Sequence, residues 1–358
     1  MKILNPIIIL LPSLLFFNCY GSVSLDPDLD IQSLKHISEK PDIKWEQKFS
    51  EPFQDVFQIN DSLVLVFTHR STAFIFNVFS GKKDGSKWHP NLRKFSTINL
   101  DNDGSFFAFT SRKGERAGLY DLALGELRWK QKAERLIEGG LAIVNDTLVA
   151  IATRNKLKFL SIDTGEILSE KHVRQGIISL QQVGDHLFII QDNGILKAFN
   201  VDKSLWEIDL GLNHESIISL ADEDKLMVTK KESLYILNNH SGKKVNEIKW
   251  EPLAYVFSLP DKEKIILISK TGKMGNFSIP TGEQIDISSI NQGLIKYEPT
   301  ISGDHCIMPF ANGYLKSVSL ENGIINWEIE TGKALTGFWR TGKGFLTQDT
   351  KKILRYYQ

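Results

Sequence analysis

A repeat of about 40 residues runs through most of this 358-residue chain and constrains its fold more than any other feature. Short apolar runs such as LVLVF, LVAIA and IILI recur eight times. The runs start 39 to 43 positions apart, at Leu63, Phe106, Leu148, Leu187, Leu226, Ile265, Cys306 and Phe345. An extended segment precedes each run, and a second extended segment, a turn and a third usually follow. Four short strands in a repeat of this length are typical of a β-propeller blade.

The two ends of the repeat region predict the number of blades. Residues 337–358 supply three strands and then stop, whereas residues 42–49 form a lone strand around Trp45 with no strands before it. Each end supplies what the other lacks, so seven continuous blades and one shared blade make eight. We therefore expect an all-β, eight-bladed propeller of four-stranded antiparallel blades over residues 42–358. Closing the ring between the termini removes sheet edges that would otherwise aggregate.

Two residue types recur at fixed places in the repeat. Glycines mark the tight turns, where a positive φ is needed, at Gly81, Gly125, Gly165, Gly242, Gly282 and Gly323. Tryptophans follow in the next strand, at Trp129, Trp206 and Trp327, and Trp45 lies in the similar N-terminal strand. A tryptophan repeated in one register is expected to fill the space between blades. A ligand role for these indoles is the alternative.

The first 41 residues differ in composition from the repeats. An apolar run follows Lys2 and ends in Phe17-Asn18-Cys19, which resembles a bacterial lipoprotein signal. We expect cleavage after residue 18, lipidation of Cys19 and a flexible tether over residues 19–41. An ordinary signal peptide or an uncleaved anchor is the alternative. Tyr20 after the cysteine favours the outer membrane over the inner membrane.

The turn and tryptophan pattern has a known counterpart. Asp163-Thr164-Gly165 and the spacings Gly125–Trp129 and Gly323–Trp327 resemble the tryptophan-docking repeat of quinoprotein propellers. Together with the lipoprotein-like N-terminus, the pattern resembles the outer-membrane assembly factor B (BamB) family. The resemblance implies an exported, lipid-anchored, non-enzymatic scaffold that faces the periplasm. Its partners would be proteins, including the machinery that folds β-barrels into the outer membrane. We expect a monomer.

Other functions find less support in the sequence. Lys plus Arg and Asp plus Glu both number 43, so no net charge draws the chain to nucleic acid. A quinone-dependent dehydrogenase often carries adjacent cysteines, but Cys19 and Cys306 lie far apart. The eight histidines form no metal-ligand motif, and no nucleophile elbow is present, so neither enzyme nor cofactor is expected.

Two acidic stretches resemble metal-binding loops at first sight. Asp26, Asp28 and Asp30 alternate as in a calcium loop, but glycine is absent from the sixth position, so they are interpreted as linker. The run from Asp101 to Gly104 is interpreted as a turn.

A ligand- or carbohydrate-binding sensor propeller is the alternative to a scaffold. An aromatic pocket in the central channel would favour that sensor.

Overall fold

The computed structural model describes residues 39–69, 72–88, 95–100, 105–111, 113–122, 124–290 and 293–358. The predicted signal segment, Cys19, most of the predicted tether and the Asp101–Gly104 turn lie outside the described residues. Among the described residues, no helix is both long enough and apolar enough to cross a membrane.

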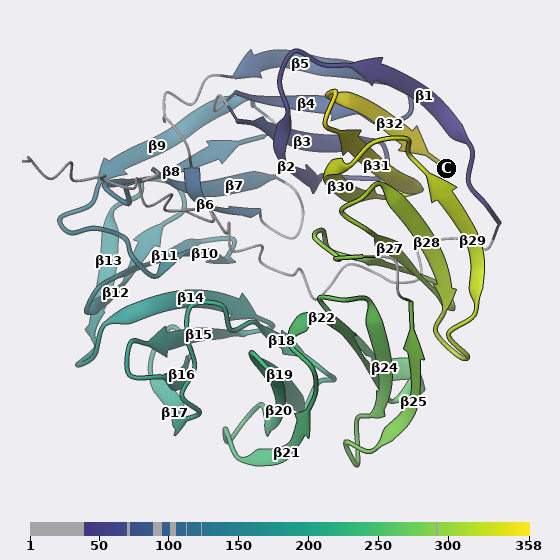
Figure 1. The fold of residues 1–358 in the computed structure, drawn as a ribbon. Coiled ribbons are helices and arrows are strands. Elements are labelled where there is room, and N and C mark those ends of the chain that lie inside the picture. The colour runs from purple at the N-terminus through teal and green to yellow at the C-terminus, as the bar shows by residue number, and fades with distance from the viewer. Residues whose placement is uncertain are drawn as a thin grey trace, which may run out of the picture.

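Eight antiparallel sheets of four strands stand around a common centre, as Figure 1 shows. The first four blades are β2–β5 (Phe53–Gln58, Leu63–Thr68, Ala73–Asn77, Lys82–Trp88), β6–β9 (Phe95–Leu100, Phe106–Ser111, Arg116–Asp121, Glu126–Lys132), β10–β13 (Gly140–Asn145, Leu148–Thr153, Lys156–Ser161, Ile167–His172) and β14–β17 (Ile177–Val183, His186–Gln191, Ile195–Phe199, Ser204–Asp209).

The fifth, sixth and seventh blades are β18–β21 (Ile218–Leu220, Lys225–Lys230, Ser233–Asn238, Lys244–Lys249), β22–β25 (Leu253–Leu259, Lys264–Ser269, Lys273–Ser278, Gln284–Ser289) and β26–β29 (Thr300–Ser302, His305–Pro309, Tyr314–Ser319, Ile325–Glu330). A short 3-10 turn, Pro260–Lys262, joins β22 to β23. The eighth blade combines β30–β32 (Leu335–Thr341, Gly344–Asp349, Ile353–Tyr357) with β1 (Ile43–Lys48). Both the fold class and the blade count are confirmed.

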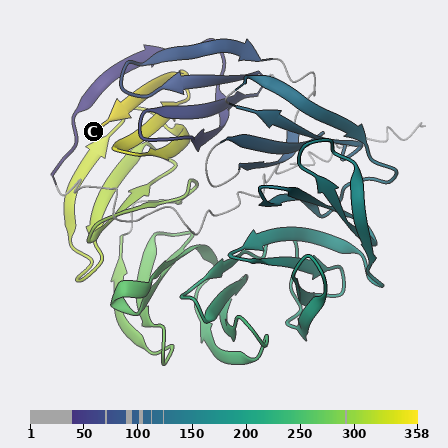
Figure 2. The same ribbon diagram turned by 180° about the vertical axis from the view of Figure 1, so that it is seen from behind.

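The termini close the ring as predicted. β1 pairs antiparallel with β32, from Ile43 opposite Tyr357 to Lys48 opposite Ile353. In Figures 1 and 2 the purple N-terminal strand lies beside the yellow C-terminal strands. Arg355 of β32 joins this pair to the rest of the blade, because its guanidinium contacts Glu46 of β1 at 2.6 Å and Asp349 of β31 at 3.0 Å.

The recurring apolar runs form the second strand of every blade. Such a strand lies in the middle of its sheet, and neighbouring blades cover both of its faces, so it is apolar without alternation. The strand β11 shows this, since five of its six residues are buried. The fourth strands are outermost (Figure 1) and are mostly exposed, as in β13 and β1.

The hydrophobic core is divided in the same way as the sheets. Eight clusters of buried side chains lie one at each junction between consecutive blades. The cluster between the eighth and first blades joins Leu346, Leu354 and Tyr356 to Phe53 and Phe74. The ring is therefore held by repeated junctions, and the junction at the termini is one of them.

Candidate functional site: the docking tryptophans, the closure groove and the inner strands

Three of the predicted tryptophans dock onto the following blade in one geometry. The indole N–H donates to a backbone carbonyl 33 residues further on, from Trp45 to Val78 at 2.7 Å, from Trp129 to Ile162 at 2.8 Å and from Trp206 to Asn239 at 2.8 Å. Each acceptor lies three residues before a turn glycine, which faces the indole. The tryptophan on the fourth strand of one blade therefore binds the turn between the third and fourth strands of the next blade.

The turn glycines have two reasons to be glycine. Gly81, Gly165 and Gly242 have φ of +68°, +72° and +67°, which residues with a side chain rarely adopt. A Cβ atom on these residues would stand 3.1, 2.6 and 2.3 Å from the docked indole. Conformation and close approach therefore both exclude larger residues at Gly165 and Gly242.

The other predicted repeat residues lie in the same register but are docked differently. Gly125, Gly282 and Gly323 also have positive φ. Asn246 takes the tryptophan position before Gly282 and donates to the carbonyl of Thr281, whereas Ser288 packs against Gly323. Trp327 is buried, but its indole nitrogen has no partner among the described residues. In the eighth blade the third strand, β32, ends at Tyr357 and the fourth strand, β1, comes from the N-terminal part of the chain, so no turn continuous in sequence joins them.

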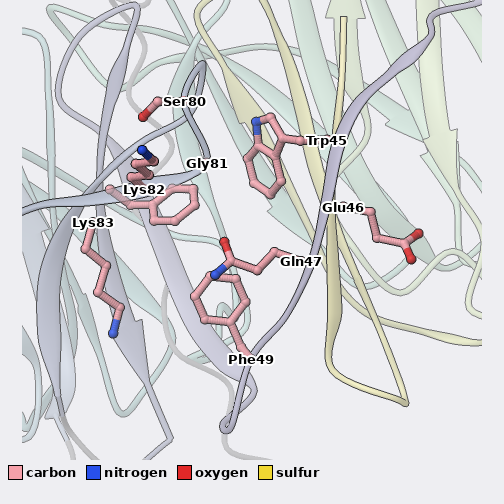
Figure 3. Close-up of a pocket in the computed structure, with 9 residues that line it drawn as sticks. Trp45, Glu46, Gln47, Phe49, Ser80, Gly81, Lys82 and Lys83 are labelled. Carbon is pink, nitrogen blue, oxygen red and sulfur yellow. The ribbon is translucent and has the colours of Figure 1, made fainter.

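A groove of about 470 Å³ borders the docked Trp45 at the junction of the eighth and first blades. Figure 3 shows that Trp45 and Gln47 of β1, and Phe49 directly after it, project toward the first blade, whereas Glu46 points the opposite way. Alternation along a strand explains this division. The groove is lined by Trp45, Glu46, Gln47, Phe49, Phe76, Ser80, Gly81, Lys82 and Lys83. It has an aromatic floor and a polar, basic rim.

Exposed aliphatic side chains gather on the outer strands. Most of them lie one to five residues after a turn glycine, on the outermost strand of a blade. The exposed fraction is 45% for Ile167 and 60% for Leu168 on β13, and 51% for Ile285 on β25. The others on outer strands and their turns are Ile43, Phe79, Leu124, Leu127, Val245, Ile287, Ile324 and Ile325. In the sequence, nothing but the strand pattern marks these positions.

Ionisable groups come together near the first strands of the sixth to eighth blades. Glu298 precedes β26, Arg340 lies on β30 and Tyr255 lies on β22, and all three are half-buried. Burial raises the pKa of Glu298 to about 7, although the charge of Arg340 opposes this shift. Burial also lowers the pKa of Arg340, whose buried Nε has no acceptor among the described residues. Sequence reasoning missed this group because its members are far apart in the chain.

The cysteine and the possible metal ligands show no arrangement for catalysis or metal binding among the described residues. Cys306 is fully buried between the sixth and seventh blades, and burial raises the pKa of its thiol. The described part of the chain holds no group of three or more His, Cys, Asp or Glu side chains able to bind a metal ion. Trp339 is half-buried on β30, and its ring centroid lies 6.0 Å from that of Phe53.

Comparison with known proteins agrees with this architecture. A family model described as "Outer membrane protein assembly factor BamB" matches residues 113–250. The solved structure of BamB from Moraxella catarrhalis is similar with a TM-score of 0.69 at 15% identity, covering 89% of this chain and 100% of that chain. The C-terminal WD40 domain of Sif2 is similar with a TM-score of 0.68 at 12% identity, covering 88% of this chain and 97% of that one.

A third solved structure, Sqt1 from Saccharomyces cerevisiae, has a TM-score of 0.69 at 12% identity, covering 87% of this chain and 96% of that one. At such identities the likeness concerns the fold. The sequence matches none of the curated proteins with which it was compared. The chain is thus a quinoprotein-like repeat propeller that resembles the BamB family, as the sequence predicted.

Proposed function

We propose that this propeller is a non-enzymatic scaffold that binds protein partners through its outer rim. The observation that carries the proposal is the set of exposed aliphatic side chains on the outer strands. These strands have one open edge each, and an aliphatic side chain there loses unfavourable contact with water when a partner covers it. The blades hold the rim in fixed positions, so a partner meets a pre-formed surface.

The second part of the proposal concerns where the protein lies in the cell and which process it supports. Cys19 follows an apolar segment, and the match to the BamB family model supports an exported chain anchored by lipid at Cys19. In this proposal the propeller faces the periplasm at the outer membrane and supports the insertion of β-barrel proteins. Replacement of Cys19 by serine should prevent incorporation of radiolabelled palmitate. Label that still enters the variant would contradict the anchor.

Purification of the native protein tests the scaffold proposal. Mild crosslinking in cells, affinity purification and mass spectrometry should recover components that assemble β-barrels. The double variant Ile167→Asp and Leu168→Asp places charge on the open β13 edge, inside the region matched by the family model. The double variant Ile324→Asp and Ile325→Asp changes a similar edge outside that region, and comparing the loss of recovery in the two double variants shows which part of the rim the partner covers. If no assembly component is recovered from the unchanged protein, the proposed pathway is wrong.

The non-enzymatic part of the proposal has a separate test. The purified protein, supplied with pyrroloquinoline quinone, calcium and a panel of alcohols, should not reduce a dye acceptor. Cofactor-dependent turnover would make the protein a dehydrogenase and overturn the proposal.

A sensor is the second candidate, and one observation favours it. Tyr255 and Trp339 are half-buried on the first strands β22 and β30, Arg340 also lies on β30, and Glu298 lies just before β26. Aromatic faces beside hydrogen-bonding groups suit sugars and other small polar ligands. A thermal-shift screen with sugars separates the two candidates, because a saturable stabilisation that Trp339→Ala removes would support the sensor.

A further inference from the structure

The groove beside Trp45 combines an apolar floor with cations that have no carboxylate partner. Phe49 packs against Phe76, with ring centroids 5.9 Å apart, and Trp45 meets the same ring at 5.6 Å. Lys82 and Lys83 are exposed at the rim, and neither forms an ion pair with a described residue. The Nζ atom of Lys83 lies 4.2 Å from the centroid of the Phe74 ring. The groove therefore presents positive charge next to aromatic surface.

The acidic residue nearest to these cations along β1 is engaged elsewhere. Glu46 lies on the opposite side of the strand from Trp45 and Phe49 (Figure 3), and its carboxylate contacts Arg355 at 2.6 Å. The carboxylate of Glu46 is therefore already paired with Arg355 and does not neutralise Lys82 or Lys83.

A second turn in the same propeller shows how the repeat neutralises this charge elsewhere. Gly242-Lys243-Lys244 in the fifth blade has the register of Gly81-Lys82-Lys83 in the first. There the Nζ atom of Lys244 contacts Glu247 at 3.1 Å. In the first blade the residue five positions after the turn glycine is Ser86, and the nearer carboxylate, Asp84, forms no ion pair with Lys82 or Lys83 among the described residues. These two lysines therefore lack the ion pair that Lys244 forms with Glu247 in the fifth blade.

The strand that borders the groove also has a free edge. β1 pairs with β32 on one side, and no described strand pairs with its other side. We propose that this groove binds an extended acidic segment of a partner protein, whose carboxylates pair with Lys82 and Lys83 and whose aliphatic side chains cover Trp45 and Phe49. An extended segment suits the site because its alternate side chains address the floor and the rim. This inference rests on the proposed scaffold function and names the partner chemistry.

A peptide-binding measurement on the purified full chain tests the proposal. The probe is a fluorescein-labelled nine-residue peptide that alternates aspartate with leucine, and fluorescence anisotropy reports binding. We expect saturable binding that weakens about tenfold in the Lys82→Glu and Lys83→Glu double variant. Binding should also weaken as sodium chloride is raised, because salt screens exposed ion pairs. A peptide that alternates lysine with leucine should not bind.

The matched control is the double variant Lys243→Glu and Lys244→Glu, which changes the net charge by the same amount. It should bind the acidic probe within twofold of the unchanged chain, and equal weakening in both double variants would overturn the proposal. The acidic residues Asp26, Asp28 and Asp30 of the same chain are a competing occupant. If replacing all three by asparagine tightened probe binding tenfold, that segment would occupy the groove and the assignment to a partner would be wrong. Failure of the probe while assembly components are still recovered refutes this inference alone.

Discussion

Replacement of Trp45 by alanine tests how the ring is closed. β1 belongs to the eighth blade through its pairing with β32, but the Trp45 indole fastens it to the first blade through Val78 and the Phe76 ring. Without the indole, β1 keeps its pairing with β32 and loses that contact with the first blade. We expect the substitution to lower the free energy of unfolding and to loosen the termini first.

The size of the effect follows from the contacts of Trp45. A fully buried tryptophan removes about 150–250 Å² from water, worth roughly 4–6 kcal/mol at about 25 cal/mol per Å². Trp45 is half-buried, so roughly half of this is lost, and its N–H···O bond adds about 1 kcal/mol. The expected loss is therefore about 3–4 kcal/mol. With an unfolding entropy of about 0.7 kcal/mol/K for roughly 300 residues, the melting temperature should fall by about 4–6 °C.

Calorimetry and hydrogen exchange check this together. Trp129→Ala is the matched control, because it removes the same kind of docking between blades that are continuous in sequence. Both variants should melt earlier, but only Trp45→Ala should accelerate amide exchange in β1 and β32. If Trp45→Ala melted within 1 °C of the unchanged protein and exchanged normally, the closure argument would be refuted.

Three further predictions concern the turn glycines, the ion pairs of Arg355 and the buried carboxyl group of Glu298. Gly242→Ala places a Cβ atom against Trp206 at positive φ and should lower the free energy of unfolding by about 2–4 kcal/mol in thermal melts. The control, Gly332→Ala, has φ of +79° but nothing within 4 Å of the new Cβ atom, and should lower it by about 1 kcal/mol. Equal losses would exclude a role for the indole contact. Arg355→Met leaves the buried Asp349 without its cation and should cost about 3 kcal/mol, whereas loss of the exposed Glu46 in Glu46→Gln should cost under about 1 kcal/mol in the same assay. Burial raises the pKa of Glu298 to about 7 from its ordinary 4.5, so the folded state binds more protons than the unfolded state between these pH values. The melting temperature should therefore fall as the pH rises from about 4.5 to 7. Glu298→Gln should remove the part of this fall that Glu298 causes.

The repeat predicted much of the fold because its signals are local. Apolar runs at a constant spacing identify the second strand of each blade, and turn glycines identify the hairpins. The lone Trp45 strand and the three C-terminal strands were enough to predict the shared eighth blade, because each end is an incomplete copy of the same unit. The tryptophan positions could be found, but not the turn to which each one is joined.

The sequence by itself therefore determined the architecture, the blade count and the way the chain closes on itself, since these depend on periodic patterns and on completeness of copies. Tertiary structure decided which groups meet. The aromatic floor beside Lys82 and Lys83 comes from β1 and the first blade, and Glu298 faces Arg340 from a neighbouring blade. Such contacts depend on how one blade is placed against the next. A sequence repeat predicts that two blades pack together, but it does not specify which polar groups are left unpaired between them.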